Sequence, residues 1–338
     1  MSGYQHAIAA WKVALDGKDL TEAMAPRLIS LSISEKRGDE ADQLDIMLHD
    51  SDGGLEIPAS GAVLKVELGW KQGSGLPTGL IDKGSYKVDE AQWRGPPDQV
   101  TVRARSADLT DAFRVRRERS FVGKTVNEIV SAIASDNGLK PSIEEALGAK
   151  MVPALGSGAK SDAALLRLLG KRFDAVATVK AGTLIFAPVG SGKTASGKAL
   201  PVETIDRNQT VSITYERIER VKHDGVEARW HDTSTGERKA LISGKTGDGK
   251  PKRLRKVYAS EADARHAAEA EAKRIGRAKA KATIEMAYGR PDIFPERPIR
   301  LTGVKDEIAA QDWIVAECEH RMDASGGMMS KLMLEAAK

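Results

Sequence analysis

Four stretches near the start of the chain alternate apolar and polar side chains at every second position. They lie within residues 29–34, 43–48, 64–70 and 100–105. This period is typical of β-strands that bury one face and expose the other. Clusters of Gly, Pro and Asp separate the stretches, as tight turns require. We therefore expect the first part of the chain to fold as an antiparallel sheet.

The composition supports many short strands and limits the alternatives. The 338 residues are 41% hydrophobic and 30% charged with a net charge of +4, which is typical of a folded soluble protein and argues against disorder or a membrane span. The chain holds 32 Gly but only five each of Phe, Tyr and Trp, which indicates many turns. Its length predicts two or three domains.

Cysteine usage and the N-terminal residues bear on the compartment. Cys318 is the only cysteine, so an internal disulfide is excluded and synthesis in a reducing compartment is the default. We interpret Cys318 as a small strand residue, because no His and Asn pattern nearby suggests an activated thiol. Residues 1–19 lack a basic region followed by a continuous apolar stretch, so no secretory signal is predicted.

From about residue 120 the apolar period becomes helical. Thr125 and Glu128 have the spacing of a capping box, which predicts a helix that ends near Asn137. A second helix is predicted over residues 161–172, and its inner side is expected to carry Leu165, Leu168 and Leu169.

Two strands follow, over 175–180 and 183–189, around a tight turn at Ala181-Gly182. The Gly-, Ser- and Lys-rich residues 190–201 are interpreted as a flexible linker. This middle part is therefore expected to be a small α+β domain.

The last part returns to strands around one Ala-rich helix at about residues 260–278. A stripe of alanines predicts close packing of that helix on a sheet. The predicted strands are 211–215, 226–231, 237–243, 280–288 and a closing hairpin, 313–321 with 328–334, about Ser325-Gly-Gly327. The fold class is thus α+β, mainly antiparallel β, with no internal sequence repeat.

Positive charge is concentrated in residues 251–290, which hold eleven Lys or Arg against five Asp or Glu. Such a stretch can attract phosphate, as in a DNA-binding late-gene regulator. However, few aromatics interleave with the basic residues of 252–256, and no helix-turn-helix pair is evident. We favour the solvated face of a helix and predict no specific nucleic-acid binding.

One motif suggests a nucleotide-binding enzyme. Gly192-Lys193-Thr194 ends a stretch that resembles a strand leading into a phosphate-binding loop. Ala187 replaces the first glycine of that motif, and Pro188 removes a backbone donor. The Gly and Pro that follow would stop the helix that should hold the phosphate. We therefore prefer the linker interpretation and predict no bound cofactor.

No other constellation supplies catalysis or metal binding. His223 and His231 are expected to be surface strand residues, because their spacing matches no closed metal site. Alternation places Cys318 and His320 on one face of a strand, where a metal would still lack two ligands. No carboxylate pair stands in an apolar frame that would separate two pKa values. The sequence therefore predicts no catalytic or metal-binding residue and no enzyme.

The order and spacing of several segments resemble the phage late control gene D family, which contains the hub proteins of contractile phage tails. These segments are 102–109, 116–120, 125–138, 161–167, 180–186, 288–291, 312–315, 319–320 and 326–334. None of them is a catalytic motif. The resemblance covers nearly the whole chain.

The resemblance implies a structural protein of a virion tail, synthesised and assembled in the cytoplasm of a bacterial host. It implies a homotrimer that joins a hexameric tail tube to a trimeric puncturing spike, beside other baseplate proteins and a tape-measure protein. In this sequence the two tube-like β domains would be residues 1–115 and 200–338. Residues 116–199 would form the small α+β domain between them. No membrane partner is implied.

Overall fold

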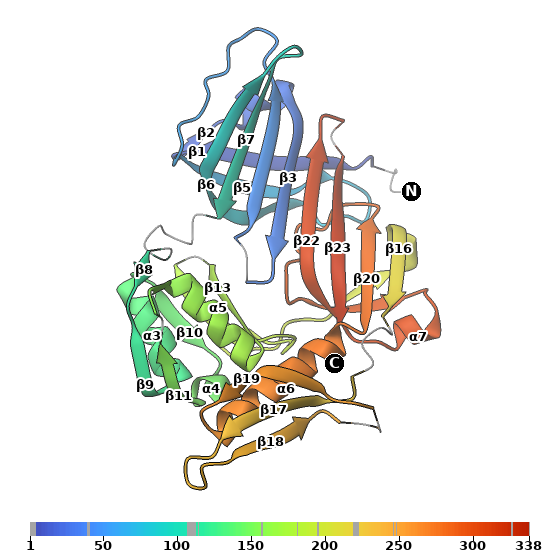
Figure 1. Ribbon diagram of the computed structural model, residues 1–338. Helices are drawn as coiled ribbons and strands as arrows, with labels where there is room; N and C mark the ends of the chain where they lie inside the picture. The colour runs from blue at the N-terminus through green and yellow to red at the C-terminus, as the bar shows by residue number, and fades with distance from the viewer. Residues whose placement is uncertain are drawn as a thin grey trace.

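The chain is mainly antiparallel β, as predicted (Figure 1). The computed structural model describes residues 5–337 except 39–40, 107–112, 114, 157, 181, 195, 219–222, 246, 248 and 326. Ala181 and Gly326, which were assigned to tight turns, and residues 107–109 of the resemblance lie outside the described residues. No helix within the described part of the chain is long and apolar enough to cross a membrane.

Eight strands from the two ends of the chain form one continuous antiparallel face (Figure 1). Their order is β16 (Thr210–Arg217), β20 (Ala280–Met286), β23 (Met328–Ala336), β22 (Trp313–Asp323), β3 (Leu28–Lys36), β4 (Gln43–His49), β7 (Gln99–Ser106) and β6 (Gly79–Arg94). The central pair, β22 and β3, joins the N-terminal and C-terminal parts through a register that runs from Glu317 opposite Lys36 to Asp323 opposite Ser30. The two expected β units therefore share a sheet.

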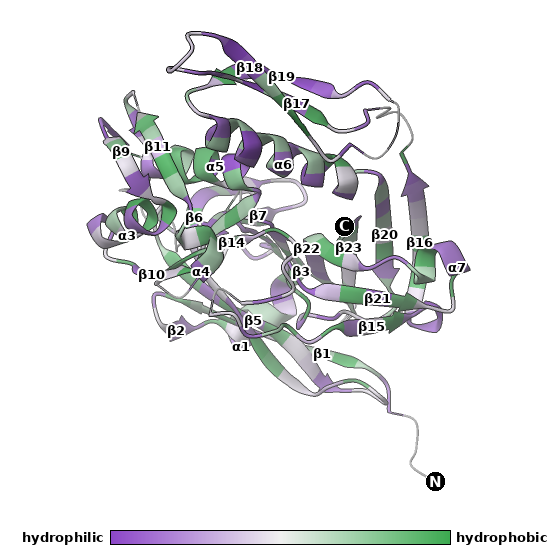
Figure 2. Ribbon diagram, turned by 90° about the horizontal axis from the view of Figure 1, so that it is seen from below, coloured by the Kyte–Doolittle hydropathy of each residue, from purple (hydrophilic) through white to green (hydrophobic). Residues whose placement is uncertain are grey.

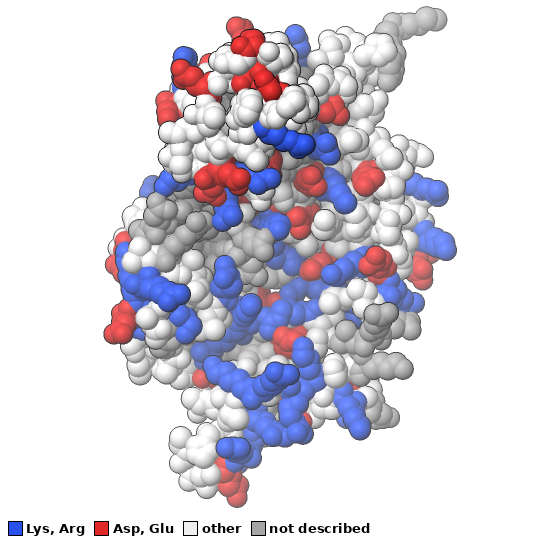
Figure 3. All heavy atoms as spheres, turned by 45° about the horizontal axis from the view of Figure 1, so that its top comes forward, with Lys and Arg blue, Asp and Glu red and all other residues white. Residues whose placement is uncertain are grey.

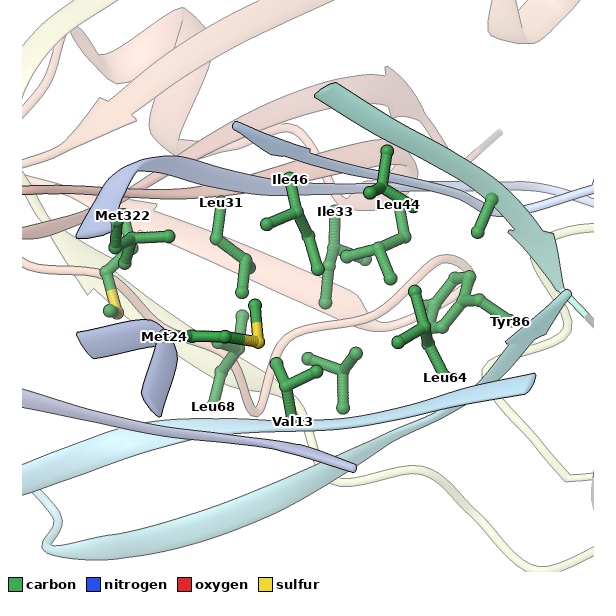
Figure 4. Packing of buried hydrophobic residues seen from close by; sticks show 14 of the residues in the cluster. Val13, Met24, Leu31, Ile33, Leu44, Ile46, Leu64, Leu68, Tyr86 and Met322 are labelled. Atoms are coloured by element: carbon green, nitrogen blue, oxygen red, sulfur yellow. The ribbon is translucent and has the colours of Figure 1, made fainter. Parts of the chain in front are cut away.

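The N-terminal unit closes by folding a second layer over the first. The first half of the long strand β6 pairs with β5 (Val63–Gln72), which pairs in turn with β1 (Ile8–Leu15), and β1 pairs with β2 (Lys18–Asp19). A short helix α1 (Thr21–Met24) and the 3-10 turn η1 (Ala25–Arg27) cover one end. The side chains that the alternation predicted to be inside meet between the layers (Figure 4), among them Leu31, Ile33, Leu44, Ile46, Leu64, Val66 and Leu68.

The C-terminal unit has its own core on the same side of the shared sheet. A parallel pair, β15 (Glu203–Asp206) and β21 (Pro298–Thr302), packs over β16, β20, β23 and β22, with η2 (Arg207–Gln209) and α7 (Asp306–Ala309) at its margins. The period-two pattern of residues 280–286 is confirmed, because Ala280, Ala282, Ile284 and Met286 are buried. The strand stops before Tyr288, which is 42% exposed and was predicted to continue it.

The middle part is built around two helices. α3 (Val126–Asp136) begins with the predicted capping box, in which Thr125 and Glu128 bond to each other's backbone amides. α5 (Asp162–Phe173) buries Leu165 and Leu169 as expected, but Leu168 is 39% exposed and Leu166 lies inside instead. The prediction for Leu168 was wrong because the face of α5 that packs against α3 and β13 runs through Leu165, Leu166 and Leu169 and leaves Leu168 outside it.

Three small sheets complete the middle part. In the first, β14 (Thr183–Pro188) pairs antiparallel with β13 (Ala175–Lys180), as predicted, and parallel with β10 (Lys140–Ile143). The others are β9 (Ser120–Thr125) with β11 (Met151–Gly156), and β8 (Arg116–Arg117) with β12 (Lys160–Ser161), with α4 (Glu145–Gly148) alongside.

The Ala-rich helix α6 (Glu261–Arg277) lies between α5 and a separate sheet, β18–β17–β19 (Figure 2). β17 (Val226–His231) pairs with β18 (Arg238–Ser243) and β19 (Lys252–Tyr258). Alanines permit this close approach on two sides, because Ala264 and Ala268 pack against β17 while Ala267 and Ala270 are also buried. Assigning all of the basic residues 251–290 to one helix face was wrong, since Lys252–Tyr258 is a strand.

Candidate functional site

The Gly192-Lys193-Thr194 segment does not form a phosphate cradle. An isolated bridge joins Lys193 to Ala199, and the Thr194 amide donates to the Lys198 carbonyl at 2.8 Å. No helix follows it among the described residues before β15. β14 has a parallel neighbour, β10, yet its end leads into this small turn. The turn also rests on the C-terminal unit, because the Gly190 amide donates to Glu296 Oε2 at 2.6 Å. The segment predicted as a linker thus contains an isolated bridge and hydrogen bonds of its own.

A buried polar cluster forms where β3 meets β22. The strand register sets Cys318 opposite Glu35, and His320 follows two residues later on the same face. Lys83 reaches the same place from β6. Cys318 and His320 are fully buried, and Glu35 and Lys83 nearly so. The predicted shared face of Cys318 and His320 is thus confirmed, and the fold adds two charged residues from the N-terminal unit.

Hydrogen bonds connect every member of the cluster. Lys83 Nζ donates to Glu35 Oε2 and, at 3.1 Å, to the Pro291 carbonyl. The Cys318 thiol donates to Glu35 Oε2 at 3.5 Å, and His320 Nε2 lies 3.3 Å from the same oxygen. The other ring nitrogen, Nδ1, lies 2.7 Å from the Ser330 hydroxyl. The orientation of the His320 ring is therefore fixed from both sides.

Electrostatics keep one negative and one positive charge in the cluster. Burial opposes ionisation of Glu35, but His320 and Lys83 outweigh it and lower the pKa of Glu35 to about 2. Burial lowers the pKa of His320, so its ring is neutral near pH 7. Burial, with the Glu35 charge, raises the pKa of the Cys318 thiol well above its ordinary range. Cys318 is therefore not an activated nucleophile.

The arrangement serves structure better than chemistry. Ligand atoms of Glu35, Cys318 and His320 lie within 4.8 Å of one another, which is close enough for one metal ion. However, the Lys83 ammonium already supplies the positive charge that Glu35 needs, and a cation there would face it directly. A fully satisfied buried network rigidifies the core that contains it. We therefore interpret the cluster as a structural link between the two β units, and we call Glu35, Lys83, Cys318 and His320 the polar lock.

Glu35 and Lys83 were not singled out in the sequence. Glu35 lies two residues after Ile33 and four after Leu31, so it shares their buried side of the strand. A charged residue at such an inward-facing position was the sequence feature that could have revealed the cluster. His223 and His231 are exposed, as predicted, but only His231 lies on a strand, because β17 begins at Val226. Lys83 had no such signal, because β6 was not predicted.

Two strand edges are open at the opposite ends of the eight-strand face. Among the described residues, β16 pairs with β20 alone, so its other edge is free. β6 pairs with β5 only up to Lys87, and its residues 89–94 pair with β7 alone within the part of the chain that the structure describes. Val211 on β16 is 66% exposed and Trp93 on β6 is 49% exposed. Open edges of this length invite pairing with another chain.

This architecture is that of tail proteins from phages and related particles. A prophage MuSo2 tail protein of Shewanella oneidensis aligns with a TM-score of 0.70 at 14% identity, covering 97% of this chain and 98% of that one. A tail protein of Neisseria meningitidis aligns with a TM-score of 0.69 at 12% identity, covering 97% and 96%. An Escherichia coli component of the type VI secretion system aligns with a TM-score of 0.59 at 9% identity, covering 92% and 73%. These likenesses define the fold.

The family follows from sequence. The chain belongs to the phage tail baseplate hub (GPD) family, whose model matches residues 43–326. It is 38% identical to the probable baseplate hub protein of Escherichia phage 186, over 94% of this chain and 90% of that protein. It is 35% identical to that of Escherichia phage P2 over the same shares. The resemblance identified from sequence is confirmed, and the protein is a baseplate hub component of a phage or phage-like tail.

Proposed function

We propose that the chain forms a homotrimeric ring that joins the hexameric tail tube to the trimeric puncturing spike of a contractile tail. In this proposal residues 1–115 and 200–338 are two tube-like units, so three copies offer six similar units to the tube. Residues 116–199 form the small α+β domain between them. The role is mechanical and requires no catalytic residue or cofactor. Copies would assemble in the host cytoplasm with the tube, the spike, other baseplate proteins and the tape measure.

The observation that carries the proposal is the direction of the two open edges. All neighbouring strands of the eight-strand face are antiparallel, from β16 at one end to β6 at the other. An even number of alternating strands makes the first and last strands run in opposite directions. β16 of one copy would therefore meet residues 89–94 of the next copy as an antiparallel neighbour, which continues the pattern without interruption.

This pairing joins two different surfaces, so copies associate head to tail and either close into a ring or grow as a filament. Closure removes both open edges, which otherwise risk indiscriminate pairing. The shared core side of the sheet stays covered by the second layers of both units. The opposite face of the eight-strand sheet would form one continuous surface of the ring, either its inner wall or its outer wall.

The test is the mass of the protein in solution. Light scattering of the purified wild-type chain is expected to give a trimer, alone or with the spike protein. Val211→Glu and Trp93→Glu each place a charge on one open edge and are expected to give folded monomers with unchanged circular dichroism. Val122→Glu, at an exposed position on β9 away from both edges, is the matched control and should stay trimeric. The ring would be refuted if the wild-type protein were a monomer that binds neither the tube protein nor the spike protein. It would also be refuted if Val211→Glu and Trp93→Glu remained trimeric.

A further inference from the structure

The described residues cover one face of the sheet β18–β17–β19 and leave the other face bare. Val226 and Ala228 point to α6 and are buried. The register places the alternate residues on the opposite face, because paired residues of adjacent strands point to the same side. We call this surface the basic face; it comprises Glu227, Arg229 and His231 on β17, Arg238, Ala240 and Ile242 on β18, and Arg253 and Val257 on β19.

The basic face holds more positive charge than its own carboxylate can neutralise. Glu227 Oε1 accepts from both Arg229 Nε and Arg253 Nε at 2.9 Å, so one carboxylate serves two guanidinium groups. Arg238 is exposed and forms no ion pair with a described residue. A surplus of cations therefore points to solvent from this one face.

A similar imbalance is found on the α6 side of the same sheet, because Lys252 pairs with Val226 and so points toward α6. Glu271 on α6 is shared by Lys252 at 2.5 Å and Arg274 at 2.6 Å, and Arg274 also bonds to the Lys171 carbonyl. Lys171 itself is exposed. In the space-filling view Lys and Arg gather over the lower part of the molecule, where this sheet and α6 lie, with few Asp or Glu among them (Figure 3). The positive region is thus larger than the sheet alone.

Apolar side chains stand among these arginines. Ile242 is 48% exposed and Val257 is 41% exposed, and both belong to the basic face. The aromatic rings of this sheet, Trp230 and Tyr258, pack instead against the apolar core between the sheet and α6. Arginine around exposed apolar groups is the composition of protein interfaces. Single-stranded nucleic acid would need exposed rings for stacking, and duplex DNA would need an element that enters a groove.

We propose that the basic face is a docking surface for the acidic, partly apolar surface of another protein. Arg238 and Arg253 would supply attraction and orientation, while Ile242 and Val257 would be buried on contact. The residues of the basic face on β18 and β19, Arg238, Ala240, Ile242, Arg253 and Val257, are exposed, so the face is accessible. This surface lies outside the eight-strand sheet, so its binding can be measured whether or not the chain forms a trimer.

The experiment compares two polyanions on the full-length protein. The probes are a fluorescent peptide of alternating Glu and Leu and a fluorescent short DNA duplex, each titrated by anisotropy at low and at physiological salt. The peptide is expected to bind more tightly than DNA and to weaken as salt rises. Arg238→Glu with Arg253→Glu should weaken peptide binding by roughly tenfold or more. Ile242→Ser should weaken the peptide and leave DNA unaffected, because only the peptide buries apolar groups.

Lys140→Glu with Arg300→Glu makes the same change of charge at two exposed positions outside this sheet, and it should leave peptide binding unchanged. Thermal unfolding of each variant confirms that it is folded. Absence of peptide binding, or equal weakening by the control pair, would overturn the proposal. Tighter binding of DNA that is lost in Arg238→Glu with Arg253→Glu would overturn it in favour of a nucleic-acid surface.

Discussion

Arg277 and Asp174 form a two-bond ion pair across 103 residues of sequence, with Nη1 to Oδ2 at 2.7 Å and Nη2 to Oδ1 at 2.5 Å. Both side chains are buried. Asp174 ends α5 in the left-handed region at φ +55°, and Arg277 is the last residue of α6. The pair therefore fastens the middle α+β part to the helix of the C-terminal part, next to the bond between Arg274 and the Lys171 carbonyl.

Breaking this pair on one side should be costly. Arg277→Met leaves the Asp174 carboxylate buried without its partner, and such losses typically cost about 3–5 kcal/mol. Adding Asp174→Asn removes the charge and keeps a residue that tolerates positive φ, so the double variant should recover much of that loss. Equilibrium denaturation measures both free energies, and limited proteolysis reports loosening of the middle part. If the double variant is no more stable than Arg277→Met, Arg277 contributes to stability through packing alone.

A second prediction concerns pH. His320 is neutral in the folded protein because burial lowers its pKa, whereas an unfolded His takes up a proton near pH 6.5. As the pH falls below about 6.5 the unfolded state binds one more proton than the folded state, so the free energy of unfolding should fall by up to about 1.4 kcal/mol per pH unit. His320→Gln should flatten this dependence between pH 7 and 5. Urea denaturation across that range measures the slope.

Two controls sharpen the pH experiment. Burial, with Lys150, also lowers the pKa of the half-buried His266, so His266→Gln should remove a smaller part of the slope in the same direction. His231→Gln, at an exposed position outside the cluster, is the control for replacing a histidine by glutamine. A wild-type slope that survives His320→Gln would show that the cluster is not the source.

The sheets were predictable where alternation was regular. Leu44, Ile46, Val100 and Val102 face the core as their spacing predicted, because a strand with one buried face has apolar residues at every second position. β1 and β6 were missed. β6 changes partner along its length and includes the buried Lys83, so its outer and inner residues do not alternate cleanly. Such a strand belongs to two layers, and a single period cannot describe it.

The sequence predicted only part of the polar lock. Cys318 and His320 are two residues apart, so alternation alone placed them together. Glu35 lies 283 residues before Cys318 and meets it only because β3 pairs with β22. Long-range strand pairing is set by the whole sheet and not by local residues. The open edges were equally hidden, since they follow from the strand order.

The nucleotide-binding alternative leads to a third prediction. Lys193 is exposed in a small turn, so Lys193→Ala should change the free energy of unfolding by less than about 0.5 kcal/mol. A calorimetric titration with Mg-ATP should give no heat of binding for wild type or variant. Thr194→Ala is the companion change, and it should cost slightly more because the Thr194 hydroxyl accepts from the Lys198 amide at 3.1 Å. Saturable heat that disappears in Lys193→Ala would revive the enzyme hypothesis.

The last prediction addresses Lys83 and Glu35. Lys83→Met leaves a buried carboxylate with only a neutral ring and a thiol beside it, and the expected loss is about 3–5 kcal/mol. Glu35→Gln leaves the buried ammonium unpaired and should cost a similar amount. The double variant carries neither charge, so it should be more stable than either single variant, with a coupling energy of at least about 1–2 kcal/mol. Urea denaturation of the four proteins completes the cycle. Losses that simply add would mean that the two residues do not act as a pair, and that the β3–β22 junction is held by its strand pairing and apolar core alone.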